Sequence, residues 1–518
     1  MTGYFNECEN VPDKKESISE KTKQGILFAG IERMSGTFLQ FLGSIALARL
    51  IAVEDFGLVQ LGTMIVGFAT RVGEFGLNMG IVQRQEEVSN AQVNTLFWLD
   101  FVIKLLIFAG VMVALPSLTS HFDAPRLQAV MPVIALYVVL DSFTGPGFML
   151  LRRRMSFGTL SQIRVFERFI ELVSAVTMAV LGFGVWSLIW CKVFASLSSV
   201  VWSARAVRWH PSLRLDLKGS RDLFSFGGWI FVRNIMRYAG ENVDYYFVGK
   251  LLGQESLGHY TRAFDLMRMP QRKLSRSLNT VLFSAFARVQ DQPEKVKAGF
   301  DKVVLSVSLA SYPLLIGAML IAPEFILFVY GEKWLPTVVP FQIMCVAGVL
   351  RSIDPFLNSV VTATGYVKHS AFRRFFEVIL VGIASFIGAS YGITGVSIGI
   401  AISSVIVMIL MVNLLKRVSN IGWRDYLTPQ LPAIGGSLVM AAVMLALRFA
   451  GTNLIGWERL LLMFGMTAAG AATYFGFLWL IRPPKVMKLL DEMVVDLRRY
   501  YRKCREWLTK HLGRLQRA

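Results

Sequence analysis

The chain has 518 residues, of which 54% are hydrophobic and 17% are charged, and its mean hydropathy is +0.52. Because ordinary soluble domains carry about 25% charged residues, this composition excludes a soluble globular protein. The net charge of +19 fits a membrane protein better than a nucleic-acid-binding one, since cytoplasmic loops of membrane proteins accumulate Lys and Arg. The sequence therefore predicts an all-α polytopic membrane protein with no nucleic acid among its partners.

A polar tail occupies residues 1–24, and about fourteen apolar runs follow, each roughly the 20 residues that a helix needs to cross a bilayer. The predicted spans of the first half are Gly25–Leu50, Gly57–Gly80, Val93–Leu118, Leu127–Leu151, Phe157–Leu181 and Gly184–Ala206. Those of the second half are Leu223–Val248, His259–Phe286, Val303–Tyr330, Val338–Thr364, Val367–Ala389 and Thr394–Leu415. A last pair is predicted at Leu431–Ala450 and Leu460–Ile481.

The two halves repeat one another. The stretch Ala48–Gly57, ARLIAVEDFG, returns 201 residues later as Gly249–Gly258, GKLLGQESLG. Two more matches follow in order at offsets of 213 and 210, and they pair Asp141–Phe143 with Asp354–Phe356 and Arg164–Glu167 with Arg374–Glu377. A nearly constant offset across three matches indicates an internal duplication.

The duplication divides the chain into parts. We expect a cytoplasmic N-terminal tail at 1–24, an N-lobe of six spans at 25–206, and a cytoplasmic inter-lobe loop at 207–222. A C-lobe of six spans at 223–416, the last pair of spans at 417–482 and a basic amphipathic cytoplasmic tail at 483–518 complete the chain. Because each repeat has an even number of spans, both repeats enter the membrane in the same orientation, and a cavity is expected between them. The role of the tail, at the inner leaflet or solvated, stays open.

The distribution of basic residues predicts the topology. With both termini in the cytoplasm, the inner connections contain most of the loop Lys and Arg, as the positive-inside rule requires. The eighth span, His259–Phe286, is rich in charge, and without it the basic C-terminal tail would face outward. We therefore expect it to cross the membrane and residues Lys250–Leu257 to lie outside.

Charged residues recur within the predicted spans. Each one costs roughly 2.5–3.5 kcal/mol at the centre of a bilayer, so they are expected to face partners or water. In the seventh span Arg233, Arg237, Glu241 and Asp244 fall within an arc of about 80°. In the eighth span the stripe contains Arg262, Asp265, Arg268, Arg272 and Arg276, and Pro270 is expected to interrupt the helix between them.

Two interpretations of these charges compete. For the third span (Asp100, Lys104) and the fifth (Arg164, Glu167, Arg168, Glu171) we favour ion pairs that hold helices together, such as Arg164 with Glu167. For the seventh and eighth spans the excess of Arg favours a hydrated cationic cavity for an anionic substrate. The candidate substrate-binding residues are Arg33, Arg233, Arg237, Arg262, Arg268, Arg272 and Arg276, and the candidate ion-coupling carboxylates are Glu241, Asp244 and Asp265. The alternative is that these carboxylates only neutralise the arginines.

Motifs of enzymes are absent from the sequence. No Gly-x-x-x-x-Gly-Lys-Ser/Thr loop, no His-Glu-x-x-His pair and no two Asp separated by one residue occur, and the four cysteines lack metal-binding spacing. We therefore expect no catalytic residues, no metal site and no cofactor.

Several of these runs, in order, resemble one family. ARLIAVEDFGLVQLG (Ala48–Gly62), EFGLNMGIVQRQE (Glu74–Glu86) and GFGVWSL (Gly182–Leu188) are similar to the Wzx-type polysaccharide transporters, as are NTLFWLDF (Asn94–Phe101), GKLLGQESLGHYTRA (Gly249–Ala263) and GEKWLP (Gly331–Pro336). The resemblance covers roughly residues 20–420 and is strongest to the colanic-acid-exporter branch of the multidrug/oligosaccharidyl-lipid/polysaccharide exporter superfamily. The C-terminal tail is longer than the family pattern.

The resemblance implies a flippase with two six-helix lobes in a V shape and an arginine-lined cavity. Its substrate would be an undecaprenyl-diphosphate-linked oligosaccharide in the bacterial inner membrane, with membrane lipids as partners and with a polysaccharide polymerase and export machinery as further candidates. A drug/cation antiporter of the same fold is the first alternative, and it would favour acidic rather than Arg-rich cavity residues. A membrane glycosyltransferase or polymerase is the second, and the sequence offers no large outer loop for its active site.

Overall fold

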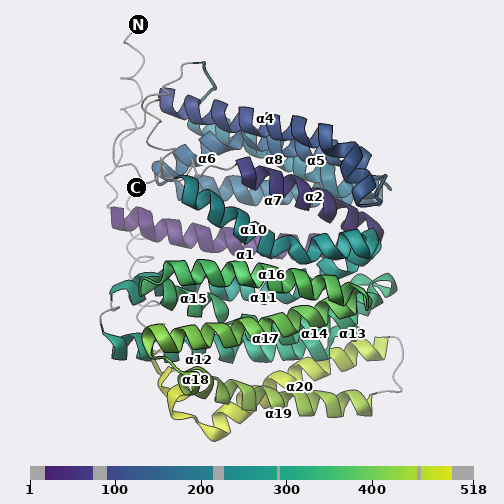
Figure 1. The fold of residues 1–518 in the computed structure, drawn as a ribbon. Helices are drawn as coiled ribbons and strands as arrows, with labels where there is room; N and C mark the ends of the chain where they lie inside the picture. The colour runs from purple at the N-terminus through teal and green to yellow at the C-terminus, as the bar shows by residue number, and fades with distance from the viewer. Residues whose placement is uncertain are drawn as a thin grey trace, which may run out of the picture. The chain divides into compact units, whose positions relative to one another are not determined.

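The computed structural model describes residues 18–73, 90–213, 227–288, 292–451, 457–489 and 491–492. Within these ranges every element of regular secondary structure is helical (Figure 1). This is the expected solution for an apolar chain in a bilayer, because a helix satisfies its own backbone hydrogen bonds where water is absent. The all-α prediction is confirmed.

The chain forms two compact units, Met1–Gly258 and His259–Ala518. The helices of the first unit are α1 (Ile18–Leu50), α2 (Val53–Gly73), α4 (Asn90–His121), α5 (Leu127–Asp141), α6 (Thr144–Arg153), α7 (Phe157–Val180), α8 (Val185–Val207) and α10 (Gly227–Leu251). Helix α11 (Gly253–Arg288) begins in the first unit and continues into the second. The second unit also contains α12 (Pro293–Leu320), α13 (Ala322–Phe325), α14 (Val338–Arg351), α15 (Asp354–Ala363), α16 (Val367–Ala389), α17 (Gly392–Ser419), α18 (Trp423–Leu427), α19 (Leu431–Ala450) and α20 (Trp457–Ile481).

Each of the fourteen predicted spans overlaps a helix or successive helices, while residues 74–80 of the second span and 223–226 of the seventh lie outside the described residues. Eight described helical segments are also long and apolar enough to cross a membrane by length and composition. Helices α10 and α11 are not among them because both carry the polar stripes described above. The count of fourteen crossings stays a prediction.

The eighth predicted span contains one error. Helix α11 runs for 36 residues without a break at Pro270, so the expected interruption is wrong. At 1.5 Å per residue the helix is about 54 Å long, more than enough to cross a bilayer. The breaks occur instead in the fourth and tenth predicted spans, where α5 gives way to α6 after Asp141 and α14 gives way to α15 before Asp354. These two Asp residues were matched by the duplication, and both lie at a helix junction.

In the first unit, α7 packs against α1 and α8, and α5 packs against α2, α4 and α8. Helix α10 packs against α2, so the first compact unit extends past the expected inter-lobe loop at 207–222. Residues 214–222 of that loop lie outside the described residues. The assignment of α10 to the second lobe of the duplication stays a prediction.

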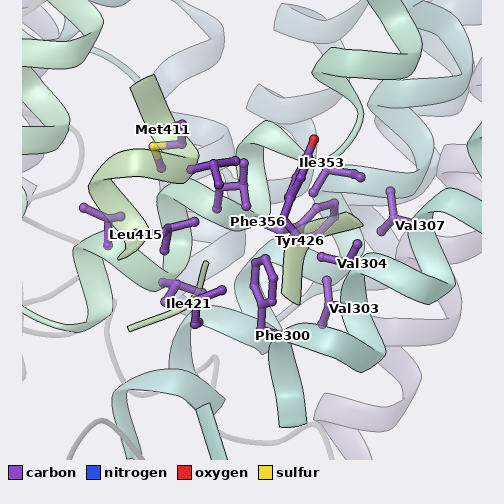
Figure 2. Packing of buried hydrophobic residues seen from close by; sticks show 14 of the residues in the cluster. Phe300, Val303, Val304, Val307, Ile353, Phe356, Met411, Leu415, Ile421 and Tyr426 are labelled. Atoms are coloured by element: carbon purple, nitrogen blue, oxygen red, sulfur yellow. The ribbon is translucent and has the colours of Figure 1, made fainter. Parts of the chain in front are cut away.

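A buried core of the second unit joins α12, α15, α17 and α18 (Figure 2). Phe300 and Val304 from α12 meet Phe356 from α15, Met411 from α17 and Tyr426 from α18. All five are at most 2% exposed. The short helix α18 is held there by an ion pair between Lys297 and Asp425 at 3.0 Å. This core lies beside the ion-pair cluster described below, to which α15 contributes Asp354.

Helices α19 and α20, the last predicted pair, lie side by side and pack against α12 (Figure 1). After α20 the chain turns back. Residues 484–489 are helical, and Val486 and Leu489 are buried against Leu305 of α12. The start of the predicted amphipathic tail therefore docks on α12, and the rest of the tail, residues 493–518, lies outside the described residues.

Candidate functional site

The polar stripe of α10 lies in the first unit. Arg237 is exposed, Glu241 is half-buried, and Asp244 is buried with only 2% of its surface accessible. The neighbouring residue Tyr238 faces α2, where its hydroxyl donates a hydrogen bond to the carbonyl oxygen of Met64 at 2.9 Å. One side of α10 is thus fixed to α2, and Arg237 is left accessible beside it.

The polar stripe of α11 continues in the second unit. Tyr260, Phe264 and Met267 are buried and form the packed face of the helix. Asp265 is exposed, and Arg262 and Arg268 are half-buried. The described stripe residues are therefore less buried than the packed face of α11, and Asp265 is the most accessible of the three.

Two arginines of this stripe stack on aromatic rings. The guanidinium of Arg262 lies 5.4 Å from the ring centre of Tyr330 and 5.2 Å from that of Trp334. Arg268 lies 4.2 Å from the ring centre of Phe264. Cation–π contacts of this kind stabilise the position of an Arg side chain. Arg262 consequently also anchors the turn that contains Trp334.

That turn is the GEKWLP motif. Gly331 ends a π-helical turn, Ile326–Tyr330, with φ of +100°, a backbone conformation that favours glycine. The 3₁₀ helix Glu332–Thr337 follows, and it places Trp334 fully inside the unit. His259 Nδ1 lies 3.0 Å from Thr337 Oγ1, which joins the turn to the start of α11 in this unit.

Four predicted site residues cannot be compared in this way. Arg33, Arg233, Arg272 and Arg276 lie within the helices α1, α10 and α11, but their side chains are outside the described part of the structure. Because the described members of the two stripes are divided between the two units, the structure brings together Arg237, Glu241 and Asp244 on α10, and Arg262, Asp265 and Arg268 on α11.

The predicted ion pairs of the third span are present. Lys104 is 2.9 Å from Asp100 and 3.6 Å from Asp141, so one buried ammonium connects α4 to the end of α5. In the fifth span the partners differ from the expected ones. Arg168 pairs with Glu171 at 2.5 Å, whereas Arg164 reaches Glu32 on α1 at 3.7 Å. The pairing interpretation is therefore confirmed for these helices, with Arg164 joined to another helix rather than to Glu167.

The second unit contains an ion-pair cluster that the sequence did not single out as a site. The buried carboxylate of Glu377 is 3.0 Å from Arg374, 3.4 Å from Arg351 and 3.5 Å from Arg373. Arg373 also contacts Asp354 at 3.1 Å. Three arginines thus share two carboxylates among α14, α15 and α16. The duplication was the available signal, because it had matched Asp354, Arg374 and Glu377 to polar residues of the first half.

A small cavity of about 20 Å³ lies beside this cluster. Its lining includes Arg351, Asp354, Glu377 and Ser403, and the hydroxyl of Ser403 has no hydrogen-bond partner among the described residues. A polar cavity of this size holds about one water molecule. The cavity is thus too small for a sugar or a diphosphate.

A larger cavity of about 190 Å³ lies in the first unit between α2, α5 and α8. Arg71 and Lys192 place positive charge on its wall, and Tyr137, Thr63 and Thr70 add hydroxyl groups. Arg71 lies within the second predicted span and Lys192 within the sixth, and neither was among the predicted site residues. No group of three or more His, Cys, Asp or Glu side chains able to hold a metal ion occurs in the described ranges.

Known proteins resemble this chain in fold and in sequence. The structure of the lipid II flippase MurJ in an inward closed conformation aligns with a TM-score of 0.67 at 13% identity, covering 87% of this chain and 98% of that one. The lipopolysaccharide biosynthesis protein WzxC of Escherichia coli (strain K12) is 26% identical over 423 residues, 79% of this chain and 84% of WzxC. The teichuronic acid biosynthesis protein TuaB of Bacillus subtilis (strain 168) is 26% identical over 381 residues, 73% of this chain and 78% of TuaB.

The structural likeness shows the fold, and the family match shows the relationship. The family model described as polysaccharide biosynthesis protein matches residues 46–339, from the end of α1 to the start of α14. This range includes both polar stripes and the duplicated turn at residues 53–57 and 254–258. Together with its apolar helices, the match makes the chain a multi-pass membrane protein that belongs to the polysaccharide biosynthesis protein family.

Proposed function

We propose that this protein flips an undecaprenyl-diphosphate-linked oligosaccharide across the bacterial inner membrane during the synthesis of a surface polysaccharide. The observation that carries the proposal is the family match over residues 46–339, which covers the Arg-rich helices α10 and α11. Two relatives are named for lipopolysaccharide and teichuronic acid biosynthesis, and both products are surface polymers. The fold is shared with a flippase of another lipid-linked precursor.

The arginine stripes would bind the diphosphate. A diphosphate that leaves bulk water loses hydration, and Arg replaces it with paired, charge-assisted hydrogen bonds to phosphate oxygens. Arg also keeps its charge in a partly dry cavity where Lys can lose a proton. The exposed Arg237 and the half-buried Arg268 are the described side chains best placed for this role, and Arg233, Arg272 and Arg276 are expected to extend the same stripes.

The rest of the substrate would meet two different environments. The polyprenyl chain would stay in the lipid, beside apolar side chains that the helices leave exposed, such as Phe372, Ile383 and Phe464. The sugars would cross in the hydrated path between the lobes as the two lobes alternate access to the two sides. A polysaccharide polymerase and export machinery would use the flipped product on the outer side.

Coupling to an ion gradient is part of the proposal. The sequence has no phosphate-binding loop of the P-loop type, so uphill movement of a charged headgroup requires another driving force. Glu241, Asp244 and Asp265 are the candidate coupling carboxylates because they lie in the same stripes as the arginines. The alternative is that they only neutralise those arginines, with sugar polymerisation pulling the flip.

A deletion strain tests the function. We expect lipid-linked repeat units to accumulate on the inner leaflet while their assembly continues, and a plasmid copy of the wild-type gene to restore export. Repeat units that reach the outer leaflet but are not polymerised would instead indicate a polymerase. Unchanged export together with increased drug sensitivity would favour the antiporter of the same fold.

The proposed topology places both termini in the cytoplasm and the turn between α10 and α11 outside. Glu255 in that turn is exposed, so a cysteine in its place is accessible to a reagent. We expect an impermeant thiol reagent to label it in intact cells. Labelling only after permeabilisation would mean that α11 does not cross the membrane as proposed.

A further inference from the structure

Arginines gather in the first unit where α7 packs against α1 and α6. The run Arg152–Arg154 spans the end of α6, and α7 carries Arg164 two turns after its start. An ion pair of 3.7 Å joins Arg164 to Glu32 of α1. The hydroxyl of Ser161 donates a hydrogen bond to the same carboxylate at 3.1 Å. A single carboxylate can offset only one of the four positive charges at this junction.

Two of these arginines repel each other. Arg152 is exposed and lies close enough to Arg164 for their charges to interact unfavourably, while Glu32 attracts it. The Nε–H group of Arg164 is buried and has no hydrogen-bond acceptor in the described part of the structure. Like charges held together and a buried donor without an acceptor both cost free energy. An anion between the two side chains would offset both costs.

Apolar packing holds the two arginines near each other. Their neighbours in the chain, Leu151 and Ile163, are buried in one cluster that also includes a residue of α8. The guanidinium of Arg164 lies 5.5 Å from the ring centre of Phe148 on α6. The backbones that carry Arg152 and Arg164 are therefore fixed side by side although their charges repel.

In the proposed topology these side chains lie near the inner headgroups. Glu32 and Arg164 are each seven residues from the cytoplasmic ends of their predicted spans, Gly25–Leu50 and Phe157–Leu181. At 1.5 Å per residue, both residues are about 10 Å inside those ends. Arg152 follows the last residue of the fourth span. Long Arg side chains extend from such a depth toward the interface.

The second repeat has no counterpart of the run Arg152–Arg154. At offsets of 210 to 213 the run corresponds to residues 362–367, TATGYV, which carry no charge. Arg374, which matches Arg164, pairs instead with Glu377 of its own helix at 3.0 Å. Both connections lie on the inner side in the proposed topology. The positive-inside rule therefore does not by itself require an arginine run at this place.

We propose that Arg152 and Arg164 form a binding site for the phosphate group of an anionic lipid in the inner leaflet. The proposal rests on the proposed topology and is independent of the transported substrate. Guanidinium groups donate paired, charge-assisted hydrogen bonds to phosphate oxygens. Basic pockets between membrane helices on the cytoplasmic side bind anionic headgroups in this way. A glycerophospholipid and a polyprenyl diphosphate both offer this chemistry.

Native mass spectrometry of the purified, delipidated protein tests the site. Dioleoyl-phosphatidylglycerol, which is anionic, is titrated beside dioleoyl-phosphatidylcholine, which is zwitterionic and has the same chains. We expect the anionic lipid to bind more tightly and Arg152→Gln to weaken its binding about fivefold, the effect of one basic residue near an anionic surface. Arg154→Gln should bind like the wild type.

Arg154→Gln is the matched control because it removes the same charge from the same run. Arg154 is exposed and takes no part in the described contacts of Arg164 and Glu32. Equal binding of the anionic lipid by Arg152→Gln and Arg154→Gln would overturn the proposal, because only the net charge would then matter. Equal binding of the two phospholipids by the wild type would also overturn it.

Melting separates lost binding from lost folding. Without added lipid, Arg152→Gln should melt no lower than the wild type, because the variant removes a repelling charge. Phosphatidylglycerol should raise the melting temperature of the wild type and of Arg154→Gln more than that of Arg152→Gln. A lower melting temperature of Arg152→Gln without lipid would make Arg152 a structural residue and would overturn the proposal.

Undecaprenyl diphosphate in place of phosphatidylglycerol distinguishes the two sources of the phosphate. Tighter binding of the diphosphate that depends on Arg152 would support the site as the place where a polyprenyl-linked substrate is captured. Binding of phosphatidylglycerol alone would support a phospholipid site. That result would stand even if a deletion strain accumulated no lipid-linked repeat units, which would overturn the proposed function only.

Discussion

Tyr238 of α10 and Met64 of α2 are joined by a hydrogen bond of 2.9 Å from the Tyr hydroxyl to the Met carbonyl oxygen. Gly67, one turn further along α2, makes room for the phenol, because a Cβ atom there would lie 2.3 Å from the Tyr238 hydroxyl oxygen. A bulky ring on one helix is thus matched to a glycine on the other. The packing of Tyr238 on Gly67 and the hydrogen bond to Met64 attach α10, the first helix of the second repeat, to the first unit.

Tyr238→Phe removes the hydroxyl and should lower stability by about 1 kcal/mol, the usual net value of one intramolecular hydrogen bond. Gly67→Leu should lower it further, because the ring must leave its place. Melting of the purified protein, followed by a thiol-reactive dye at the buried Cys191, measures both. Cys8, Cys345 and Cys504 are replaced by Ser in this background so that only the first unit reports. Equal melting temperatures for Gly67→Leu and the control Gly110→Leu, where nothing lies within 4 Å of an added Cβ atom, would contradict the match.

The cluster around Glu377 predicts a larger effect in the second unit. Its side chain is 7% exposed and is shared by Arg351, Arg373 and Arg374. Removal of one partner from a buried ion pair costs about 3–5 kcal/mol because it leaves uncompensated charge. We therefore expect Glu377→Gln to expose the buried Cys345 to the dye at a clearly lower temperature than in the wild type.

The control for that variant is Glu492→Gln. The Glu492 side chain is 41% exposed and pairs with Lys302, so its loss should hardly change the melting of the second unit. If Glu377→Gln melts like this control, the cluster does not stabilise the unit, and its charges would need a role in transport.

Arg237 and Arg272 lie near the middle of the stripes on α10 and α11, and both test the cationic path. Replacement of either by Ala should abolish sugar export while membrane abundance stays normal, because a binding residue contributes little to folding. Replacement by Lys should restore export only in part, since the charge remains but paired hydrogen bonding is lost. An export assay and an immunoblot of the membrane fraction measure the two quantities.

Reduced abundance would identify a structural role, in which Glu241 or Asp265 is left without a partner. Arg482→Ala is the control, because Arg482 stacks on Trp479 at the end of α20 and belongs to neither stripe. Normal export and normal abundance for both Ala variants would exclude these two arginines from the path.

The segment after α20 is predicted to detach from α12 when its ion pairs are reversed. Lys485 contacts Asp301 at 2.9 Å, and Lys302 donates a hydrogen bond to Glu492. Lys485→Glu should increase proteolysis of the tail in inside-out membrane vesicles, and the double variant with Asp301→Lys should restore protection. Cleavage that stays at the level of the single variant would contradict the pairing.

The same segment has a pH dependence. The hydrogen bond from Lys302 holds the pKa of Glu492 below its usual range. Because the carboxyl group has a lower pKa in the docked form than in the undocked form, its ion pair stabilises docking at a pH above the undocked pKa. This stabilisation is lost as the pH falls below about 4. Protection from proteolysis should therefore be constant near neutral pH and should weaken only in acid.

The order and the approximate ends of the helices could be predicted from the sequence. Helix α16 occupies Val367–Ala389 and α19 occupies Leu431–Ala450, the same bounds that the apolar runs predicted. Such runs are informative because a bilayer leaves an apolar segment few alternatives to a helix. The duplication matched Asp141 with Asp354, and the structure places both residues at helix junctions that were not predicted.

The partners of the charges required the tertiary structure. Periodicity within the fifth span predicted Glu167 as the partner of Arg164. Because α1 packs against α7, Glu32 of α1 is the carboxylate that pairs with Arg164 instead. Glu377 likewise collects Arg351 from another helix. The direction of each stripe follows from the 100° between successive residues, whereas the partner depends on the distance and rotation of a second helix. The sequence of one helix does not reveal the distance and rotation of the second.

By itself, the sequence determined an all-helical membrane protein with two repeats and cationic stripes on two neighbouring helices. Hydrophobicity and helical periodicity are properties of a single segment, so both can be recognised from the sequence alone. Only the tertiary structure decided that Gly57 packs on Gln254 and Gly258 on Val53. Close packing between backbones is set by the crossing of two helices, and the repeated turn acquires its meaning only where its two copies meet.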